Sequence, residues 1–185
     1  EMNPALIAPG LFSTAWAIEE FGVDSFEPGD VLITNDPYRG CAHMPEHTML
    51  KPIFYHGELF GFAANVAHVA EIGGMAVGSF AANATDVFQE GLRLPLTRLM
   101  RRGEYVTDVW RIIMANHRTP DNTWGDFHAM LGSLNIGERR VVKLLDRYGP
   151  DFINRATDEL SAYAERWMRG EIARIPDGEY SFADP

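Results

Sequence analysis

Two apolar runs joined by a two-residue turn occupy residues 48–66, which read TMLKPIFYHGELFGFAANV. The runs, 48–55 and 58–66, are rich in aromatic and branched residues, and His56-Gly57 separates them. A short spacer that contains glycine between two such runs is typical of a β-hairpin. The sequence therefore predicts that a hairpin forms the centre of the fold.

The elements around the hairpin indicate the fold class. Residues 31–34, VLIT, follow the turn Glu27-Pro28-Gly29-Asp30 and predict a buried strand, and the second half shows helical spacing of apolar residues. We expect helices over 10–21, 108–116 and from about Asn122 to the Gly149-Pro150 stop, then a last helix capped by Asp151 and a short strand over 179–182. The fold class is α+β, with a strand-rich N-terminal half and a helical C-terminal half. We expect one domain over 1–185, composed of a strand-rich region (1–100) and a helical region (101–185).

The first expected helix also has a predicted orientation. Leu11, Ala15 and Ile18 share one helical face, which we expect to pack on the core.

Charge and composition exclude several functional classes. The chain has 26 acidic and 16 basic residues and a formal net charge of −10, so it lacks the basic surface that nucleic-acid binding requires. No apolar run is long enough to cross a membrane, and the first residues lack the pattern of a secretory signal. The single cysteine cannot form an internal disulfide, which fits a reducing compartment. We therefore expect a cytoplasmic protein without nucleic-acid or membrane partners.

Histidines and carboxylates cluster around the predicted hairpin. Four of the six histidines lie between positions 43 and 68, and Asp36, Glu46 and Glu71 lie nearby. Pro45 disfavours a helix, so His43 and Glu46 would project from a loop. A hairpin returns its far end to its start, which would bring His68 and Glu71 back to His43 and Glu46. Imidazole and carboxylate are ligands that suit zinc, manganese and iron.

Structural roles for the same residues remain open from spacing alone. Histidines often cap turns or satisfy hydrogen bonds in a core, and Asn35-Asp36-Pro37 is a common turn former because Asp bonds to the local backbone. His47 and His56 fit surface or turn positions better than ligand positions. The pattern includes no Cys-x-x-Cys pair to strengthen a metal site.

A series of motifs in fixed order resembles the hydantoinase B/oxoprolinase family. In this sequence the motifs are GDVLITNDPYRG (29–40), His43-x-Pro-Glu46-His47, KPIFYHGEL (51–59), Ala67-His68-x-x-Glu71-Ile-Gly-Gly-Met75, QEGLRLP (89–95), Ala115-Asn116-x-Arg118-Thr-Pro120, Gly125-Asp126 and Pro176-Asp177-Gly178-Glu-Tyr180. They extend over nearly the whole chain, so the resemblance is more specific than the His-x-x-Glu pair alone.

The resemblance implies a metal-dependent subunit of an ATP-dependent enzyme. The family includes B-type subunits of hydantoin-opening enzymes and 5-oxoprolinases, and subunits of acetone and acetophenone carboxylases. An A-type subunit uses ATP to activate the substrate, and the B-type part completes the reaction at a divalent metal (Mn, Zn or Fe). The family's ligands map onto His43, Glu46 and His68. Asp36 and Glu71 are additional ligands or a base by the same resemblance.

In this interpretation the present chain binds the substrate, and the partner subunit binds the nucleotide. Arg93 and Arg118 are candidates for holding an anionic substrate or a phosphorylated intermediate, because guanidinium binds such oxygens in bidentate fashion, although surface ion pairs are equally open for both. Glu90, in the same motif as Arg93, is a further candidate for substrate binding. No P-loop surrounds Lys51 or Lys143, so we expect ATP to be bound by the partner and no cofactor-binding residue beyond the metal ligands.

Three substitutions and the chain length depart from the family pattern. Position 42 is Ala where the family has Thr, and Glu46 and Glu71 replace Asp. The longer side chains keep the ligand type, whereas loss of the Thr hydroxyl removes a potential outer hydrogen bond. B-type subunits are also much longer, so this chain resembles a fragment. Three functions stay open: a hydrolase of cyclic amides, an ATP-dependent ketone carboxylase, and a non-catalytic fragment or interaction module.

Overall fold

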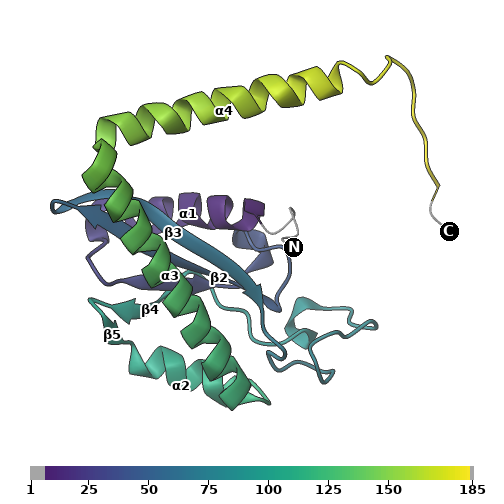
Figure 1. Ribbon diagram of the computed structural model, residues 1–185. Helices are drawn as coiled ribbons and strands as arrows, with labels where there is room; N and C mark the ends of the chain where they lie inside the picture. The colour runs from purple at the N-terminus through teal and green to yellow at the C-terminus, as the bar shows by residue number, and fades with distance from the viewer. Residues whose placement is uncertain (1–6, 184–185) are drawn as a thin grey trace. The chain divides into compact units, whose positions relative to one another are not determined.

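The computed structural model of the chain describes residues 7–183. Contacts divide the chain into two compact units, with the boundary between Val142 and Lys143. The elements, shown in Figure 1, are α1 (Ile7–Phe21), η2 (Val23–Ser25), β1 (Val31–Thr34), η3 (Pro37–Arg39), β2 (Glu46–Tyr55), β3 (Glu58–His68), η4 (Val87–Gln89), β4 (Thr97–Arg101), β5 (Glu104–Tyr105), α2 (Thr107–Asn116), α3 (Pro120–Tyr148) and α4 (Pro150–Ile172). Among the described residues, none of the helices combines the length and apolarity that a membrane span needs.

A five-stranded sheet in the order β3-β2-β1-β4-β5 organises the first unit, and every neighbouring pair is antiparallel. The predicted hairpin is confirmed as its longest pair, and His56 and Gly57 form the turn, with φ of 50° and 87°. Two successive residues with positive φ match the twist of a hairpin. The α+β class, with strands in the N-terminal half and helices in the C-terminal half, is confirmed.

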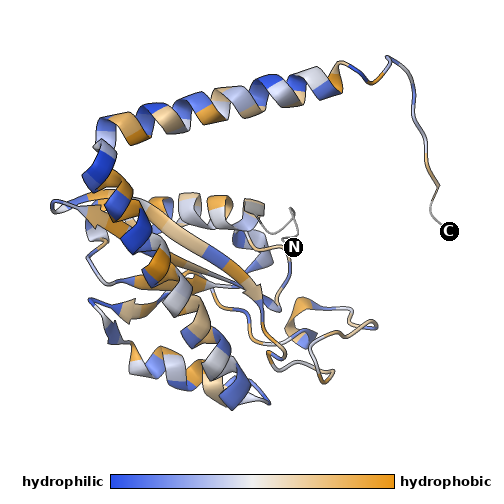
Figure 2. Cartoon of the chain, viewed as in Figure 1, coloured by the Kyte–Doolittle hydropathy of each residue, from blue (hydrophilic) through white to orange (hydrophobic). Residues whose placement is uncertain are grey.

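Helices cover both faces of this sheet (Figure 1). Leu32 and Leu50 pack with Ala17 of α1 on one face. Successive side chains of a strand point to opposite faces, so the neighbouring residues Ile33 and Met49 pack on the other face. There they contact α2 and α3, and Phe127 of α3 is fully buried. Because both faces are covered, all four residues of β1 are buried, and Figure 2 shows the mainly hydrophobic strands.

The orientation expected for α1 is wrong. Its buried positions include Ser13 and Ala17, whereas Leu11 is 72% exposed. The helix lies so close to β3 that a Cβ on Gly10 would be 3.3 Å from the Cβ of Ala64. Small residues permit this close packing, so they face the sheet in place of the larger apolar side chains.

Two further expectations fail near the C-terminal end. Residues 179–182 form no strand and are exposed, because an isolated strand requires a hydrogen-bonding neighbour, which the described chain does not supply there. Asp151 lies within the first turn of α4, after Gly149 and Pro150, and no described side chain caps that helix. Figure 2 shows hydrophobic and hydrophilic residues alternating along α4.

Candidate metal centre

Strand register and a tight turn bring three potential ligands together. Glu46 begins β2 and is the direct partner of His68 at the end of β3, so their side chains leave the same face of the hairpin. The backbone N–H of Glu46 donates to the carbonyl of His43 at 3.1 Å, which closes the turn that returns His43 over Glu46. This geometry confirms that the hairpin returns His68 to the two earlier residues.

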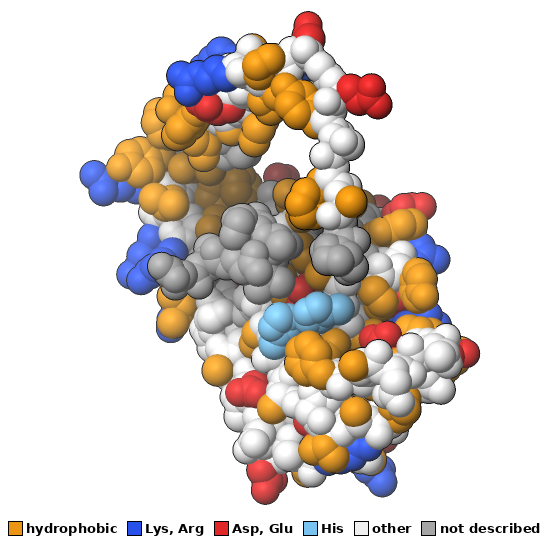
Figure 3. All heavy atoms as spheres, turned by 90° about the vertical axis from the view of Figure 1, so that its right-hand side faces the viewer, with side chains coloured by type: hydrophobic (Ala, Val, Ile, Leu, Met, Phe, Trp, Pro, Cys, Tyr) orange, Lys and Arg blue, Asp and Glu red, His pale blue; other side chains and the backbone are white. Residues whose placement is uncertain are grey.

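The three side chains converge closely. The ligand atoms of His43, Glu46 and His68 all lie within 4.8 Å of one another. The Nε2 atoms of His43 and His68 are 2.8 Å apart, and their rings stack with centroids 4.4 Å apart. Glu46 is fully buried, whereas His68 is exposed. Figure 3 shows histidine side chains gathered beside hydrophobic ones on the surface of the molecule. The cluster therefore combines a buried carboxylate with solvent access.

This donor set fits a divalent cation. Oε1 of Glu46 accepts a hydrogen bond from the N–H of Ala42 at 3.2 Å, but the buried Oε2 has no hydrogen-bond partner among the described residues. A buried carboxylate oxygen without a partner is costly unless a cation compensates it. Two imidazole nitrogens on one tetrahedral zinc ion lie about 3.3 Å apart, close to the separation seen here. The Nδ1 of His43 also lacks a partner among these residues, so its ring has no outer hydrogen bond of the kind that usually orients a ligand.

Asp36 and Glu71 lie outside this three-residue cluster. Oδ1 of Asp36 accepts from the N–H of Tyr38 and begins η3, the turn role that Asn-Asp-Pro sequences often have. Glu71 accepts from Nη1 of Arg118 at 2.9 and 3.0 Å and from the N–H of Gly73. Both carboxylates are thus engaged in holding loops.

Arg118 and Glu71 fasten the loop that follows β3. Beyond Glu71, the Arg118 guanidinium donates to the carbonyls of Gly73 and Gly74, at the start of the loop. Burial opposes ionisation of Glu71, but the hydrogen bonds from Arg118 and from the backbone outweigh it and hold the pKa of the carboxyl below its usual value. Glu71 is therefore a charged anchor for this loop.

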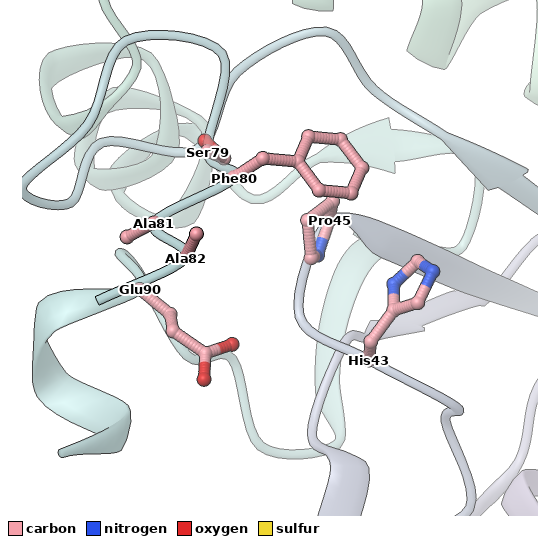
Figure 4. A pocket seen from close by; sticks show the side chains of 7 residues that line it. All are labelled: His43, Pro45, Ser79, Phe80, Ala81, Ala82 and Glu90. Atoms are coloured by element: carbon pink, nitrogen blue, oxygen red, sulfur yellow. The ribbon is translucent and has the colours of Figure 1, made fainter. Parts of the chain in front are cut away.

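The anchored loop faces His43 across a pocket of about 280 Å³. Phe80, Ala81 and Ala82 of the loop and Pro45 form its apolar lining. Figure 4 shows the Glu90 carboxylate pointing into the space on the side opposite the His43 imidazole. The structure thus places Glu90 at the same pocket as the candidate ligand His43, whereas Arg93 and Arg118 do not line it.

Asn35 and Ser79 hold the site together, although no sequence pattern indicated such a role for either. Buried Asn35 donates to the carbonyls of Met44 and Leu92 and accepts from the N–H of Leu94, so it joins the His43 turn to the chain before β4. Ser79 accepts from the N–H of Ile72 and donates to Glu71. The only sequence signal for Asn35 is its position at the end of a strand, beside Asp-Pro.

Replacing Asn35 by alanine is expected to lower the free energy of unfolding by about 3 kcal/mol, because three backbone groups, two in buried and one in a part-buried hydrogen bond, lose their partner together. Urea unfolding followed by circular dichroism measures this loss. Asn83, an exposed residue of the loop, gives a matched control, since Asn83→Ala should change stability by no more than about 0.5 kcal/mol. Equal effects of the two variants would show that Asn35 does not join these segments.

His47 is buried, contrary to the expectation of a surface or turn position. It follows Glu46 and so points to the opposite face of the sheet, where its ring lies 5.2 Å from Phe127 and 6.0 Å from His117. Burial lowers the pKa of His47 to about 3 and that of His117 to about 4, and the Glu71 charge only partly opposes the shift at His117. His56, by contrast, occupies the hairpin turn as expected.

These two histidines should make the fold less stable as the pH falls from about 6.5 to 4.5. In the unfolded state a histidine takes up a proton near pH 6.5, whereas His117 and His47 stay neutral in the folded state. Each of them therefore lowers the free energy of unfolding by about 1.4 kcal/mol for each pH unit of acidification in this window. Glu71 has a lowered pKa, so its stabilisation is present above about pH 4.5 and is lost only at lower pH. Urea titrations between pH 7 and 4.5 measure the slope, and His117→Gln should reduce it by about half. An unchanged slope in that variant would contradict the assignment.

Comparison with known proteins places this arrangement in a family. Residues 5–185 match the family described as hydantoinase B/oxoprolinase. The chain is 36% identical over 174 residues to a protein of Pseudomonas sp. (strain NS671) that is named provisionally as the B-type subunit of a D-/L-hydantoinase, covering 94% of this chain and 29% of that protein. It is 28% identical over 166 residues to the acetophenone carboxylase delta subunit of Aromatoleum aromaticum, covering 89% and 24%.

A solved structure shows the same fold. The crystal structure of the ATP-dependent caprolactamase from Pseudomonas jessenii superposes with a TM-score of 0.86 at 33% identity, covering 92% of this chain and 29% of that one. The chain thus spans less than a third of the length of each of these relatives. With nearly all of its residues matched, the chain belongs to the hydantoinase B/oxoprolinase family.

Proposed function

We propose that this chain forms the metal-binding part of the B-type subunit of an ATP-dependent hydrolase that opens cyclic amides, of the hydantoin or 5-oxoproline kind. The observation that carries the proposal is the convergence of His43, Glu46 and His68 beside a pocket. A divalent cation held there would supply Lewis-acid polarisation of an amide carbonyl or a more acidic bound water. The hydantoinase and caprolactamase relatives support this reaction class.

The pocket residues fit a small cyclic amide. Phe80, Ala81 and Ala82 of the loop and Pro45 offer an apolar wall that packs against ring carbons and excludes water. The Glu90 carboxylate makes no hydrogen bond or ion pair with the described residues, so it is free to accept a hydrogen bond from a ring N–H. Glu46 is held by the N–H of Ala42 through one oxygen, and its second oxygen has no hydrogen-bond partner among the described residues.

ATP would be handled by an A-type ATPase subunit in this assembly. Neither lysine lies in a P-loop sequence, and the relatives named as subunits indicate multi-subunit enzymes. The A-type subunit would activate the amide by phosphorylation, and the chain described here would complete ring opening.

Metal binding by the purified chain tests the proposal. Equilibrium dialysis against zinc or manganese should give one ion per chain, and His68→Ala should weaken binding by at least about 100-fold because a ligand is lost. His56→Asn is the matched control, since His56 is exposed in the hairpin turn and asparagine tolerates its positive φ. Binding of no ion by the unmodified chain, or equal binding by His68→Ala, would contradict the proposal.

Ketone carboxylation is the second candidate, because the acetophenone carboxylase delta subunit aligns with 89% of this chain. The two reactions differ in whether carbon from bicarbonate enters the product. We expect the chain assembled with its ATPase partner to open a hydantoin or lactam without incorporating labelled bicarbonate. Incorporation of label in the presence of a ketone would favour carboxylation instead.

A further inference from the structure

A second pocket, of about 460 Å³, lies outside the metal cluster and is lined in part by three glycines. The lining includes Gly73, Gly74, Gly91, Phe88, Arg93 and Asn116. Among the described residues, Arg93 is the only ionisable one that lines it. The pocket therefore presents a single positive charge among backbone and neutral side chains.

The Arg93 guanidinium has unused hydrogen-bond donors. Its nearest charged neighbour is Asp36, with 3.9 Å between Nε of Arg93 and Oδ2 of Asp36, and no hydrogen bond joins the guanidinium to any described residue. Asp36 approaches the Nε side, so the two Nη groups at the end of the guanidinium keep their donors free. A guanidinium carries five donors in a fixed fork that matches two oxygens of a carboxylate or phosphate.

Two aromatic rings hold this guanidinium in place. Its central carbon lies 5.6 Å from the ring centroid of Tyr38 and 5.9 Å from that of Phe88, within the range of cation–π contact. Tyr38 and Phe88 are 68% and 77% exposed, so the rings support Arg93 without closing the pocket to solvent. An arginine fixed in this way loses less conformational entropy when an anion binds.

Arg118, the other arginine in the family motifs, has a different role. Its Nη1 donates to both oxygens of Glu71 and to the carbonyl of Gly73, and its Nη2 donates to the carbonyl of Gly74. These contacts engage both Nη groups of Arg118 and pair its charge with that of Glu71. Of the two arginines, only Arg93 makes no hydrogen bond through either Nη group to the described residues.

Two of the glycines allow the chain segments that frame the pocket to touch at the backbone. A Cβ on Gly74 would lie 2.6 Å from the carbonyl carbon and oxygen of Glu90, and a Cβ on Gly91 would lie 2.6 Å from the carbonyl oxygen of Ile72. Both glycines also have positive φ. Only residues without a side chain fit there, so the two chain segments that frame the pocket lie in direct contact.

We propose that the Arg93 pocket binds an oxyanion, a carboxylate or a phosphate group, through bidentate hydrogen bonds from the guanidinium. Anion binding by this chain would indicate a specific site. Residues 1–100 contain 12 acidic and four basic residues, and this negative net charge repels anions elsewhere on the surface. The inference rests on the proposed function only for the source of the anion, which is either the carboxylate of a substrate or a transferred phosphoryl group.

Calorimetric titration of the metal-free full chain with inorganic phosphate and, separately, with acetate tests the proposal at constant ionic strength. We expect one anion per chain, and Arg93→Gln should weaken binding by at least about tenfold, because both charge-assisted hydrogen bonds are lost. Arg93→Lys, which keeps the charge but not the fork, should give an intermediate loss. The control is Arg111→Gln, since Arg111 is 79% exposed beside Asp108, and it should bind as the unmodified chain does.

The outcomes separate this site from the metal site. Tighter binding of phosphate than of acetate identifies a phosphoryl ligand, and the reverse identifies a substrate carboxylate. His68→Ala should bind the anion unchanged, so failure of the metal experiment leaves this result intact. The proposal is overturned if the unmodified chain binds no anion. It is also overturned if Arg93→Gln binds equally well with an unchanged circular dichroism spectrum. If Arg93→Gln does not fold, Arg93→Lys provides the same comparison.

Discussion

Replacing Glu46 by glutamine is expected to weaken zinc or manganese binding by at least about 100-fold, since changes in the outer hydrogen bonds of metal ligands alone cost 10- to 100-fold. Glu46 is the only carboxylate in the three-residue cluster and is fully buried. Glutamine keeps the shape and the carbonyl oxygen that accepts from Ala42, but it removes the negative charge that opposes the cation. Competition with a fluorescent chelator measures the affinity.

The same substitution separates metal binding from folding. Without metal, the variant should be at least as stable as the unmodified chain, because the amide that replaces the buried carboxylate carries no charge. With metal at 100 times its dissociation constant, the unmodified chain should gain about 2.7 kcal/mol and the variant almost nothing. Glu58→Gln is the control, since Glu58 is exposed at the start of β3. Equal stabilisation of Glu46→Gln by metal would remove Glu46 from the ligand set.

Replacing Arg118 by alanine is expected to lower the free energy of unfolding by about 2 to 3 kcal/mol. The substitution leaves Glu71, 3% exposed at its side chain, as a buried charge without its ion pair, and it frees the carbonyls of Gly73 and Gly74. Because the Arg118 side chain is 42% exposed, water moderates the loss below that of a fully buried pair. Urea unfolding at pH 7 measures the change.

Two variants control for this prediction. Arg111→Ala removes an exposed arginine from an exposed i,i+3 pair with Asp108 and should cost no more than about 0.5 kcal/mol. In Glu71→Gln the buried charge disappears, so adding Arg118→Ala to that variant should cost clearly less than Arg118→Ala alone. Additive effects of the two substitutions would show that the ion pair does not anchor the loop.

Local patterns predicted the hairpin and most helices because these elements depend on neighbours close in sequence. His56-Gly57 has the backbone conformation that a two-residue turn requires, and Pro150 begins α4 as a proline at the first helical turn does. The spacing of apolar residues gave a wrong prediction where packing against an element distant in sequence decides which side chains are buried. The large apolar residues of α1 suggested its inner face, but the close approach of β3 selects Ser13 and Ala17.

For the candidate site, hairpin closure could be derived from sequence, whereas the other roles could not. The turn pairs Tyr55 with Glu58, and the same register would pair Glu46 with Ala67. An irregularity between Ile53 and Phe54 shifts the register by one residue and pairs Glu46 with His68, which the sequence did not indicate. The partners of Glu71 and Arg118 depend on the path of the long loop after β3, for which small residues gave no regular pattern. Asp36, by contrast, bonds to the N–H of Tyr38 in the local turn that its Asn-Asp-Pro sequence indicated. Burial of His47 required α3, whose Phe127 packs against its ring.

The sequence by itself determined the fold class and the hairpin that returns His68 toward His43 and Glu46, because alternation and turn chemistry act over short distances. The tertiary structure decided which charged groups are free. It engages Arg118 and Glu71 with each other, leaves Arg93 with unused donors, and leaves Glu46 with a buried oxygen without a partner among the described residues. A motif does not show whether its arginine or glutamate forms an ion pair, because the pairing partner lies dozens of positions away in the sequence.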